Sequence, residues 1–200
     1  MEVDRFKLKF RFKKIGIIPT DYSRKDLQKS TTSPVSWCQQ NQTLPPFPIL
    51  AHGNEVQEAD MPFLQEKNAS IVHCPLAHRW FGRQPFPLTL FQKHGIPVTL
   101  GTDSPAGSSN ISFDLRQEVA ELQRNHPQVT AREAWSMITT QPAQALQLKS
   151  EIGCLSPGAW ADWVAWRIPP HDDPLEAILT SREAAEWSSV GGQITHHETV

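Results

Sequence analysis

Three short apolar runs, each ending in a polar residue and each followed by a helical pattern, constrain the fold of this chain most strongly. The runs lie at residues 47–51, 69–74 and 97–101. Helices are predicted at 60–67, 87–94 and 114–124, the last with an apolar face. Strands that are apolar on both faces are typical of parallel sheets. The alternation in units of roughly 25 residues predicts β/α repeats, either of a barrel or of a doubly wound sheet.

Local signals support further helices. Gly95 follows the second predicted helix, at the position where glycine commonly ends a helix. Thr130 and Glu133 have the spacing of a capping box, which predicts a helix beginning near Thr130 with Ala134 and Ile138 on one face. Pro142 is expected to open another short helix that continues through residue 146.

The last quarter of the chain has a different pattern. Residues 153–158 have turn chemistry, residues 161–166 read as a strand, and residues 173–179 suggest a short helix. Residues 186–195 suggest a hairpin interrupted by two glycines. We therefore expect three parts: an atypical segment 1–44, an α/β unit 45–150, and a small β element 151–200.

The N-terminal segment remains open to two interpretations. Residues 7–14 alternate basic and apolar side chains, which favours an edge strand followed by a polar loop. The alternative is a basic arm that binds nucleic acid. The formal net charge of -2 for the whole chain disfavours a nucleic-acid partner.

Cysteine usage and hydropathy limit the compartment. Cys38, Cys74 and Cys154 are scattered and form no CxxC pair, which argues against a structural zinc site and favours a reduced compartment. No apolar run approaches the ~20 residues of a membrane helix. A cytoplasmic protein without a membrane partner is expected.

Polar side chains at the ends of the three predicted strands are the candidate functional residues. His52 ends the first, His73 and Cys74 end the second, and Asp103 follows the third. Catalytic groups in β/α barrels lie at these carboxyl ends. A carboxylate with imidazoles suits a divalent metal or acid–base catalysis. The structural alternatives are a backbone-capped His52, a core His73, and an Asp103 that caps a turn.

Five motifs in order resemble the amidohydrolase superfamily, in the branch of chlorohydrolases and aminohydrolases that includes guanine and S-adenosylhomocysteine deaminases. They are residues 49–54 (ILAHGN), 70–78 (SIVHCPLAH), 100–104 (LGTDS), 140–146 (TQPAQAL) and 152–162 (IGCLSPGAWAD). The resemblance covers residue 45 to about residue 192. It implies strands six to eight of a (β/α)8 barrel of the TIM type, with their helices, plus part of a small composite β domain.

The resemblance also implies roles. Asp103 would bind a divalent metal, expected to be zinc, and accept a proton from the metal-bound water. His52 would polarise the substrate. His78, Trp80 and Ser104 would bind the substrate, with His78, Arg79 and Trp80 on a loop after the second strand. The implied reaction is hydrolysis of a C–N bond in a small purine-like molecule or cyclic amine.

Several family features are missing. The chain has no His-x-His pair, and His196 and His197 are adjacent and lie in the wrong place. Residues 52–55 have His-x-x-Glu spacing, but the seventh-strand motif follows too soon for this to be the fifth-strand motif. Ala77 stands where the family often has Ser. Zinc needs about three protein ligands plus water in a catalytic site, so the metal site is incomplete here.

Two hypotheses follow. The chain is a fragment of a metal-dependent amidohydrolase, inactive alone, that pairs with a complementing N-terminal half or forms a homo-oligomer. Alternatively, it is a non-catalytic remnant or interaction module that retains a half-barrel fold. A nucleotide-binding doubly wound domain is disfavoured because no GxGxxG or P-loop follows a strand.

Overall fold

A three-stranded parallel sheet organises the first part of the computed structural model, which describes residues 33–105 and 113–197. Its strands are β1 (Ile49–Ala51), β2 (Ser70–His73) and β3 (Val98–Leu100), in the order β1-β2-β3. Ile71 pairs with Leu50 on one side and with Val98 on the other. The predicted strands are therefore present and parallel, and no closed barrel forms within the described ranges.

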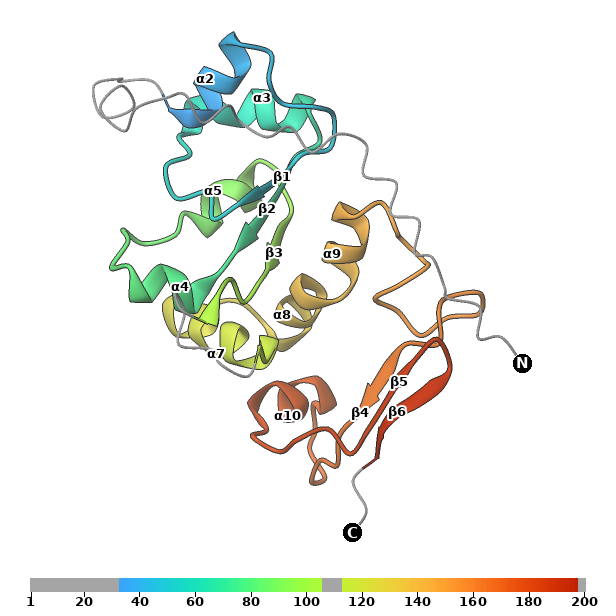
Figure 1. Ribbon diagram of the computed structural model, residues 1–200. Helices are drawn as coiled ribbons and strands as arrows, with labels where there is room; N and C mark the ends of the chain where they lie inside the picture. Colours follow the sequence, from blue (N-terminus) through green and yellow to red (C-terminus); the bar gives the residue numbers. More distant parts are fainter. Residues whose placement is uncertain (1–32, 106–112, 198–200) are drawn as a thin grey trace.

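Helices connect and cover these strands (Figure 1). A 3-10 turn, η1 (Glu58–Asp60), and α3 (Met61–Glu66) separate β1 from β2. Helices α4 (Pro75–Trp80) and α5 (Leu88–Lys93) separate β2 from β3, and α7 (Leu115–Asn125), α8 (Ala131–Ile138) and α9 (Thr140–Ala145) follow. The mixed α/β architecture predicted from the repeated strand–helix pattern is confirmed.

Local helix signals act as predicted. Thr130 and Glu133 form the reciprocal capping box at the start of α8: the Thr130 amide donates to Glu133 Oε2 at 2.8 Å, and the Glu133 amide donates to Thr130 Oγ1 at 3.2 Å. Gly95 lies just past α5 with a φ of +63°, in the left-handed region that favours glycine. The predicted helix at Pro142 begins two residues earlier than expected, at Thr140.

The core lies between the sheet and its helices. Ile71 and Phe91 are fully buried there, with Met61 and Leu64 from α3 and Leu122 from α7. Each fully buried large apolar side chain contributes about 1.5–3 kcal/mol to stability.

The expectation that every strand is buried on both faces is wrong for β1. Leu50 packs against the core, whereas Ile49 is 43% exposed and Ala51 is also exposed. β3 is an edge strand too but is buried throughout, so the described residues cover both faces of β3 and only one face of β1. Alternation along a strand sends neighbouring side chains to opposite faces.

Two helices were not expected from the sequence. α2 (Pro34–Gln40) occupies a stretch predicted as polar loop; Ser33 caps it and Pro34 opens it. Buried Asp60 accepts hydrogen bonds from the Ser33 hydroxyl at 2.5 Å and the Ser36 hydroxyl at 2.7 Å, which holds α2 against the α/β unit. The strand predicted at 7–14 and the basic-arm alternative lie outside the described residues.

Helix α4 is the second helix that the sequence did not predict. His78, Arg79 and Trp80 were expected on a loop, but they lie on a helix that begins at Pro75. Proline ends a strand and also suits the first turn of a helix, because it has no backbone N–H to leave unpaired. The sequence interpretation used only the first of these properties.

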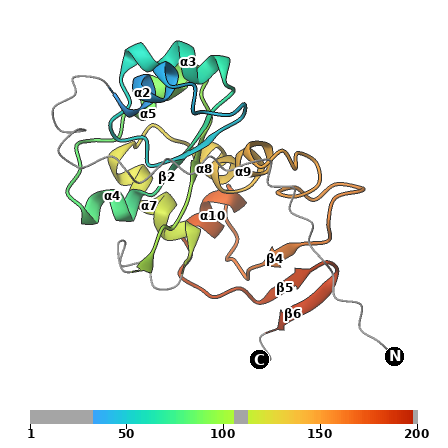
Figure 2. The same ribbon diagram turned by 45° about the horizontal axis from the view of Figure 1, so that its top comes forward.

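The C-terminal residues form a separate antiparallel sheet. Its strands are β4 (Trp163–Ala165), β5 (Trp187–Val190) and β6 (Gln193–His197), with the predicted hairpin turn at Gly191 and Gly192. Helix α10 (Pro174–Thr180) lies between β4 and β5 in sequence and packs on α7 and α8 (Figure 2). It joins the β element to the α/β unit.

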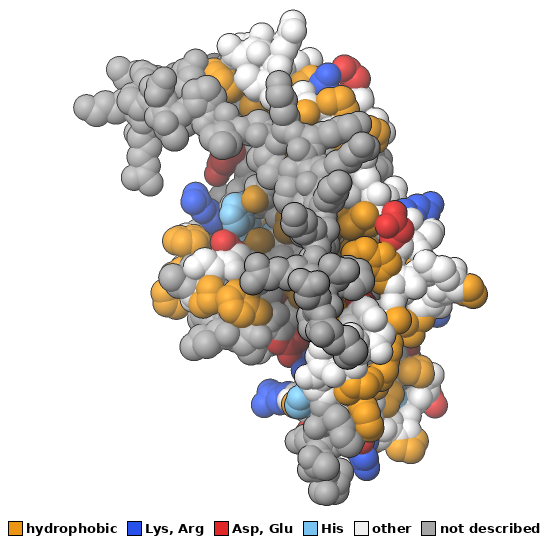
Figure 3. Space-filling model, turned by 45° about the vertical axis from the view of Figure 1, so that its right-hand side comes forward, with side chains coloured by type: hydrophobic (Ala, Val, Ile, Leu, Met, Phe, Trp, Pro, Cys, Tyr) orange, Lys and Arg blue, Asp and Glu red, His pale blue; other side chains and the backbone are white. Residues whose placement is uncertain are grey.

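Hydrophobic side chains are exposed on and near this second sheet. In Figure 3 they gather over the lower part of the visible face. The exposed set in this region is Leu155, Trp160, Val164, Val190 and Ile194. Among the described residues, no helix is long and apolar enough to cross a membrane.

Candidate active site at the carboxyl ends of the strands

The structure brings His52 and Asp103 together. His52 directly follows β1, and Asp103 lies three residues past the end of β3. Their closest side-chain atoms, His52 Nε2 and Asp103 Oδ2, are 3.8 Å apart. β2 lies between the two strands, which separates them by about 10 Å at the usual strand spacing. The two side chains therefore converge over the carboxyl end of β2.

Backbone conformation at both positions helps this convergence. His52 has a φ of +66° and Asp103 a φ of +53°, both in the left-handed region. Such a conformation costs a non-glycine residue of order 1–3 kcal/mol and is concentrated at functional sites. The His52 amide still donates to the Val72 carbonyl at 2.7 Å, so the turn starts from a fixed sheet position.

A close contact at Gly101 supports the turn that carries Asp103. A Cβ at this position would lie 2.8 Å from Val72 Cγ1, closer than real contacts allow. Only glycine lets the end of β3 approach β2 so closely. The small residue in the Gly101-Thr102-Asp103 stretch thus brings the aspartate close to the end of β2.

The His52–Asp103 pair is accessible to solvent. The side chains are 43% and 33% exposed. Ion pairs at this exposure contribute about 0–1 kcal/mol to stability. The pair therefore adds little to the fold, and both groups are reachable by a ligand.

His73 and Cys74 do not join this pair. The His73 ring is buried and stacks on Phe86 with centroids 3.8 Å apart and planes within 6°. Burial lowers the pKa of His73 to about 3, so the ring is neutral. Burial, with the nearby charges of Asp103 and Glu118, raises the pKa of the Cys74 thiol to about 12, so the thiol is protonated at neutral pH. These contacts favour the structural interpretation of His73.

His78 reaches the same region from α4. Its Nε2 donates to the Gln84 carbonyl at 2.6 Å, and its Nδ1 lies 3.0 Å from Oδ1 of Asn54, two residues past His52. Burial lowers the pKa of His78, which favours the neutral ring. Because Nε2 donates to Gln84, Nδ1 of the neutral ring accepts, so its contact with Asn54 becomes a hydrogen bond when the Asn54 amide turns its Nδ2–H toward the ring. Trp80, at the end of α4, is 62% exposed, and Ser104 is exposed next to Asp103.

Three residues near the site were missed from the sequence. Asn54 contacts His78, and its place two residues after His52 in the 49–54 motif could have indicated it. Glu118 and Glu121 of α7 are buried and bind α4. No sequence signal marks them, because glutamate on an amphipathic helix is normally a surface residue. Arg79, expected beside the pocket, pairs with Glu121 instead.

The donor set in the described residues fits part of a metal site. Asp103 offers a carboxylate and His52 an imidazole within 3.8 Å of each other. No group of three or more histidine, cysteine, aspartate or glutamate side chains suited to a metal occurs in the described ranges. A catalytic zinc needs about three protein ligands. Asp103 and His52 could therefore supply part of a zinc site, and the remaining ligands must come from other residues.

A pocket of about 330 Å³ lies away from this pair. It is bounded by α5, the approach to β3, α8 and α9, with Gln92, Glu133 and Gln141 among its polar lining residues. It therefore opens at the amino end of β3. Sites in parallel β/α folds form at the carboxyl ends, so the His52–Asp103 edge remains the candidate.

The chain has parallel β/α units followed by a small antiparallel sheet, and a histidine and an aspartate meet at the carboxyl ends of its parallel strands. Proteins of this α/β type place enzyme sites at the carboxyl ends of the strands. The family model described as the Amidohydrolase family matches residues 21–191. The chain belongs to this family.

Individual relatives agree. The 5-methylthioadenosine/S-adenosylhomocysteine deaminase of Pyrococcus furiosus is 35% identical over 137 residues, which cover 64% of this chain and 32% of the relative. The guanine deaminase of Mus musculus is 27% identical over 135 residues, with coverages of 64% and 30%. The chain thus spans about a third of the length of these curated relatives.

Solved structures share the fold. The structure of Escherichia coli guanine deaminase matches with a TM-score of 0.64 at 24% identity, covering 76% of this chain and 39% of that one. An adenosine deaminase from Xanthomonas campestris, solved with bound zinc, matches with a TM-score of 0.76 at 18% identity, with coverages of 86% and 42%.

Proposed function

We propose that this chain takes part in the metal-dependent hydrolysis of a C–N bond, as a deaminase does, with Asp103 and His52 at the reacting centre. The observation that carries this proposal is the 3.8 Å approach of His52 Nε2 to Asp103 Oδ2 at the carboxyl edge of the parallel sheet. Membership of the amidohydrolase family supports the hydrolytic reaction. Relatives named as deaminases support the C–N bond.

The two residues have distinct roles in the proposal. Asp103 would hold a divalent metal and would accept a proton from the attacking water. His52 donates a hydrogen bond to the substrate atom on which negative charge develops. When bound, a divalent ion, proposed to be zinc, would supply a water with a pKa lowered to about 7. Ser104, His78 and Trp80 are proposed to contact the substrate around this centre.

The proposed place of this chain in a barrel explains the incomplete ligand set. We assign β1, β2 and β3 to strands six, seven and eight of a (β/α)8 barrel, residues 45–150 to its C-terminal half, and residues 151–200 to part of a composite β domain. Residues 1–44 are proposed as a remnant of the preceding β/α unit. The other metal ligands then come from residues outside those described or from a complementing chain. The described residues, 33–105 and 113–197, do not suffice for catalysis by themselves.

The substrate proposed for the assembled site is a small purine-like molecule. The named relatives are deaminases of guanine and of 5-methylthioadenosine or S-adenosylhomocysteine. Both names describe purine compounds with an exocyclic amine. Ammonia release from this panel of compounds is the direct activity measurement.

A second candidate is a non-catalytic module that retains the fold. The lack of a three-ligand cluster in the described residues favours it. It requires that metal does not bind at His52 and Asp103. The two candidates therefore differ in a measurement that needs no activity.

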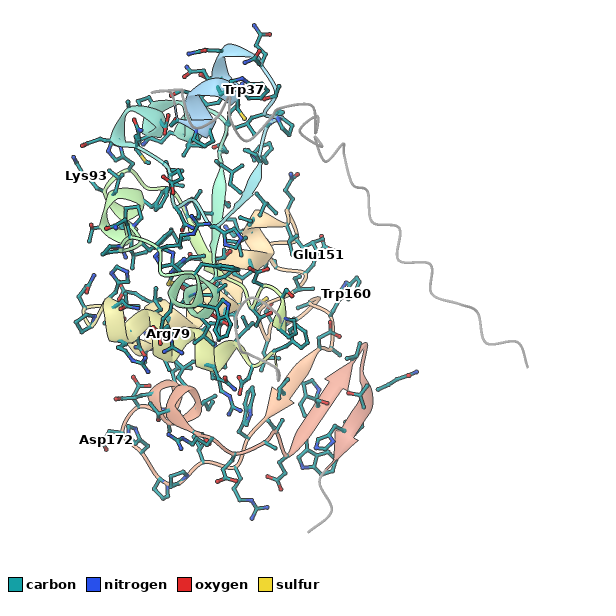
Figure 4. All side chains as sticks on the ribbon, turned by 60° about the vertical axis from the view of Figure 1, so that its left-hand side comes forward. Trp37, Arg79, Lys93, Glu151, Trp160 and Asp172 are labelled. Carbon is teal, nitrogen blue, oxygen red and sulfur yellow. The ribbon has the colours of Figure 1, made fainter. Side chains whose placement is uncertain are left out.

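Paramagnetic line broadening by Co2+ tests the proposal, because NMR detects even weak binding at Asp103 and reports on the nearby His52 ring. We expect signals of His52 and Asp103 to broaden in the full chain, and at least about tenfold more Co2+ to be needed in Asp103→Asn, which corresponds to about 1.4 kcal/mol. Asp172→Asn is the matched control: Asp172 is an exposed carboxylate that Figure 4 places on the C-terminal part. Equal broadening in Asp103→Asn and in the unmodified chain would refute the metal site and leave the non-catalytic module.

A further inference from the structure

Two buried carboxylates on α7 face α4. Glu118 and Glu121 are three residues apart, so they lie on the same side of the helix. They are 0% and 2% exposed, although glutamate is rarely buried without a partner. The helices α4 and α7 pack against each other along this side. Two buried charges at one helix–helix contact need a reason beyond packing, because an apolar pair would fill the space at less cost in desolvation.

Glu118 binds the first turn of α4. Its Oε2 accepts a hydrogen bond from the Leu76 amide at 2.9 Å. Leu76 lies at the second position of the helix, where backbone N–H groups have no partner within the helix. A carboxylate there also interacts favourably with the positive end of the helix dipole. α4 has no side-chain cap at Cys74, so Glu118 supplies a side-chain partner for its first turn.

Glu121 binds the last turn of α4. Arg79 Nη1 lies 2.5 Å from Glu121 Oε2, and Arg124 Nη1 lies 2.8 Å from the same oxygen. Figure 4 shows Arg79 beside α7. The carboxylate is buried while Arg79 is half exposed, so the charge-assisted contact is shielded from water on one side. The two glutamates therefore hold α4 at both ends.

His78 lies between these two anchors. It is on α4, two residues after Leu76 and one before Arg79. Its Nδ1 lies 3.0 Å from Asn54 Oδ1, on the loop that starts at His52. A shift of α4 on α7 would therefore move His78 relative to Asn54, and with it the edge of the site beside His52.

We propose that Glu118 and Glu121 are positioning residues that hold α4 so that His78 stays in contact with Asn54 at the edge of the His52–Asp103 site. This inference rests on the proposed function for its role in substrate binding. The contact that it describes exists without metal or substrate, so it can be tested independently of the reaction.

Hydrogen exchange and imidazole NMR test the proposal on the full chain. In Glu118→Met the side chain keeps its approximate length but has no acceptor oxygen. We expect the Leu76 amide to exchange about 10- to 100-fold faster, the effect of losing one hydrogen bond to a charged group. The Nδ1 and Nε2 signals of His78 should move toward each other as the ring leaves Gln84 and Asn54 and samples both tautomers.

Two further variants separate positioning from general destabilisation. Glu118→Gln keeps an acceptor oxygen, so the exchange rate of its Leu76 amide should stay within about threefold of that in the unmodified chain. Its His78 signals should stay close to those of the unmodified chain. Glu121→Gln removes the charge that binds Arg79 and should move the His78 signals, whereas Arg124→Gln leaves the Arg79–Glu121 contact in place and should not. The Ile71 amide in β2 reports whether the core remains intact.

The outcomes are unambiguous. The proposal is supported by faster exchange of the Leu76 amide in Glu118→Met and by altered His78 signals in both Glu118→Met and Glu121→Gln. In both variants the exchange of the Ile71 amide should be unchanged. Unchanged His78 signals in both variants would overturn it, as would equal effects of Arg124→Gln. If Glu118→Met does not fold, the comparison of Glu121→Gln with Arg124→Gln decides. Equal Co2+ broadening in Asp103→Asn and in the unmodified chain would refute the proposed function and leave these readouts unaffected.

Discussion

His52 Nε2 and Asp103 Oδ2 meet 3.8 Å apart although a whole strand, β2, separates the strands that carry them. The meeting depends on left-handed backbone at both residues and on the close approach of Gly101 to Val72. Both side chains remain accessible to solvent. An arrangement that adds little stability, and that uses strained backbone, is typical of a site kept for binding or catalysis.

Asp103→Asn should leave stability nearly unchanged while it weakens metal binding. The pair with His52 is partly exposed and contributes at most about 1 kcal/mol. Asparagine also tolerates the left-handed conformation of Asp103. Urea denaturation should give an unfolding free energy within about 1 kcal/mol of the unmodified chain. A larger loss would mean that Asp103 has a structural role that the described contacts do not show.

Gly101→Ala should destabilise the protein by about 1–3 kcal/mol. The added methyl group would lie 2.8 Å from Val72 Cγ1, so the Val72 side chain or the backbone beside it would have to shift. Equilibrium urea denaturation measures the loss. The double variant Gly101→Ala, Val72→Ala removes the clashing atom and should recover part of it. Additive effects of the two substitutions would argue against this contact.

His73 should make stability depend on pH below its ordinary pKa of 6.5. Burial lowers the folded-state pKa to about 3, so between pH 6.5 and about 3 the unfolded chain binds a proton that the folded chain does not. Stability therefore falls as the pH falls through this window, by up to about 1.4 kcal/mol per pH unit, and is fully present above it. His73→Phe, which keeps an aromatic ring against Phe86, should flatten this slope. An unchanged slope would show that other groups cause it.

Asp60→Asn should loosen α2. The buried carboxylate accepts hydrogen bonds from Ser33 and Ser36 of the α2 start and from the Gln57 amide at 2.8 Å. Hydrogen bonds to a charged group are worth about 1.5–3 kcal/mol, and the amide replaces one acceptor oxygen with a donor. Thermal denaturation and faster amide exchange in 34–40 should both report the change. Asp172→Asn is the control for charge alone, and equal effects of the two would contradict the prediction.

The sequence by itself determined the elements whose signals are local. Alternating strand and helix patterns located β1, β2, β3 and α7, the capping box located α8, and two adjacent glycines located the β5–β6 turn. Such signals depend on neighbouring residues along the chain, so they can be read without the fold. They failed at α4, where Pro75 both ends a strand and begins a helix.

Only the tertiary structure decided which of the strand-end residues share a site. His52, His73 and Asp103 all follow predicted strands, and only the family resemblance gave His52 and Asp103 roles; the fold sends His73 into the core against Phe86 and brings the other two together. It also buried Glu118 and Glu121 against α4, where the sequence indicated an ordinary helix surface. The physical reason is that burial and long-range contact depend on what packs against a residue, and residues 42 positions apart, such as Arg79 and Glu121, meet only when the chain has folded.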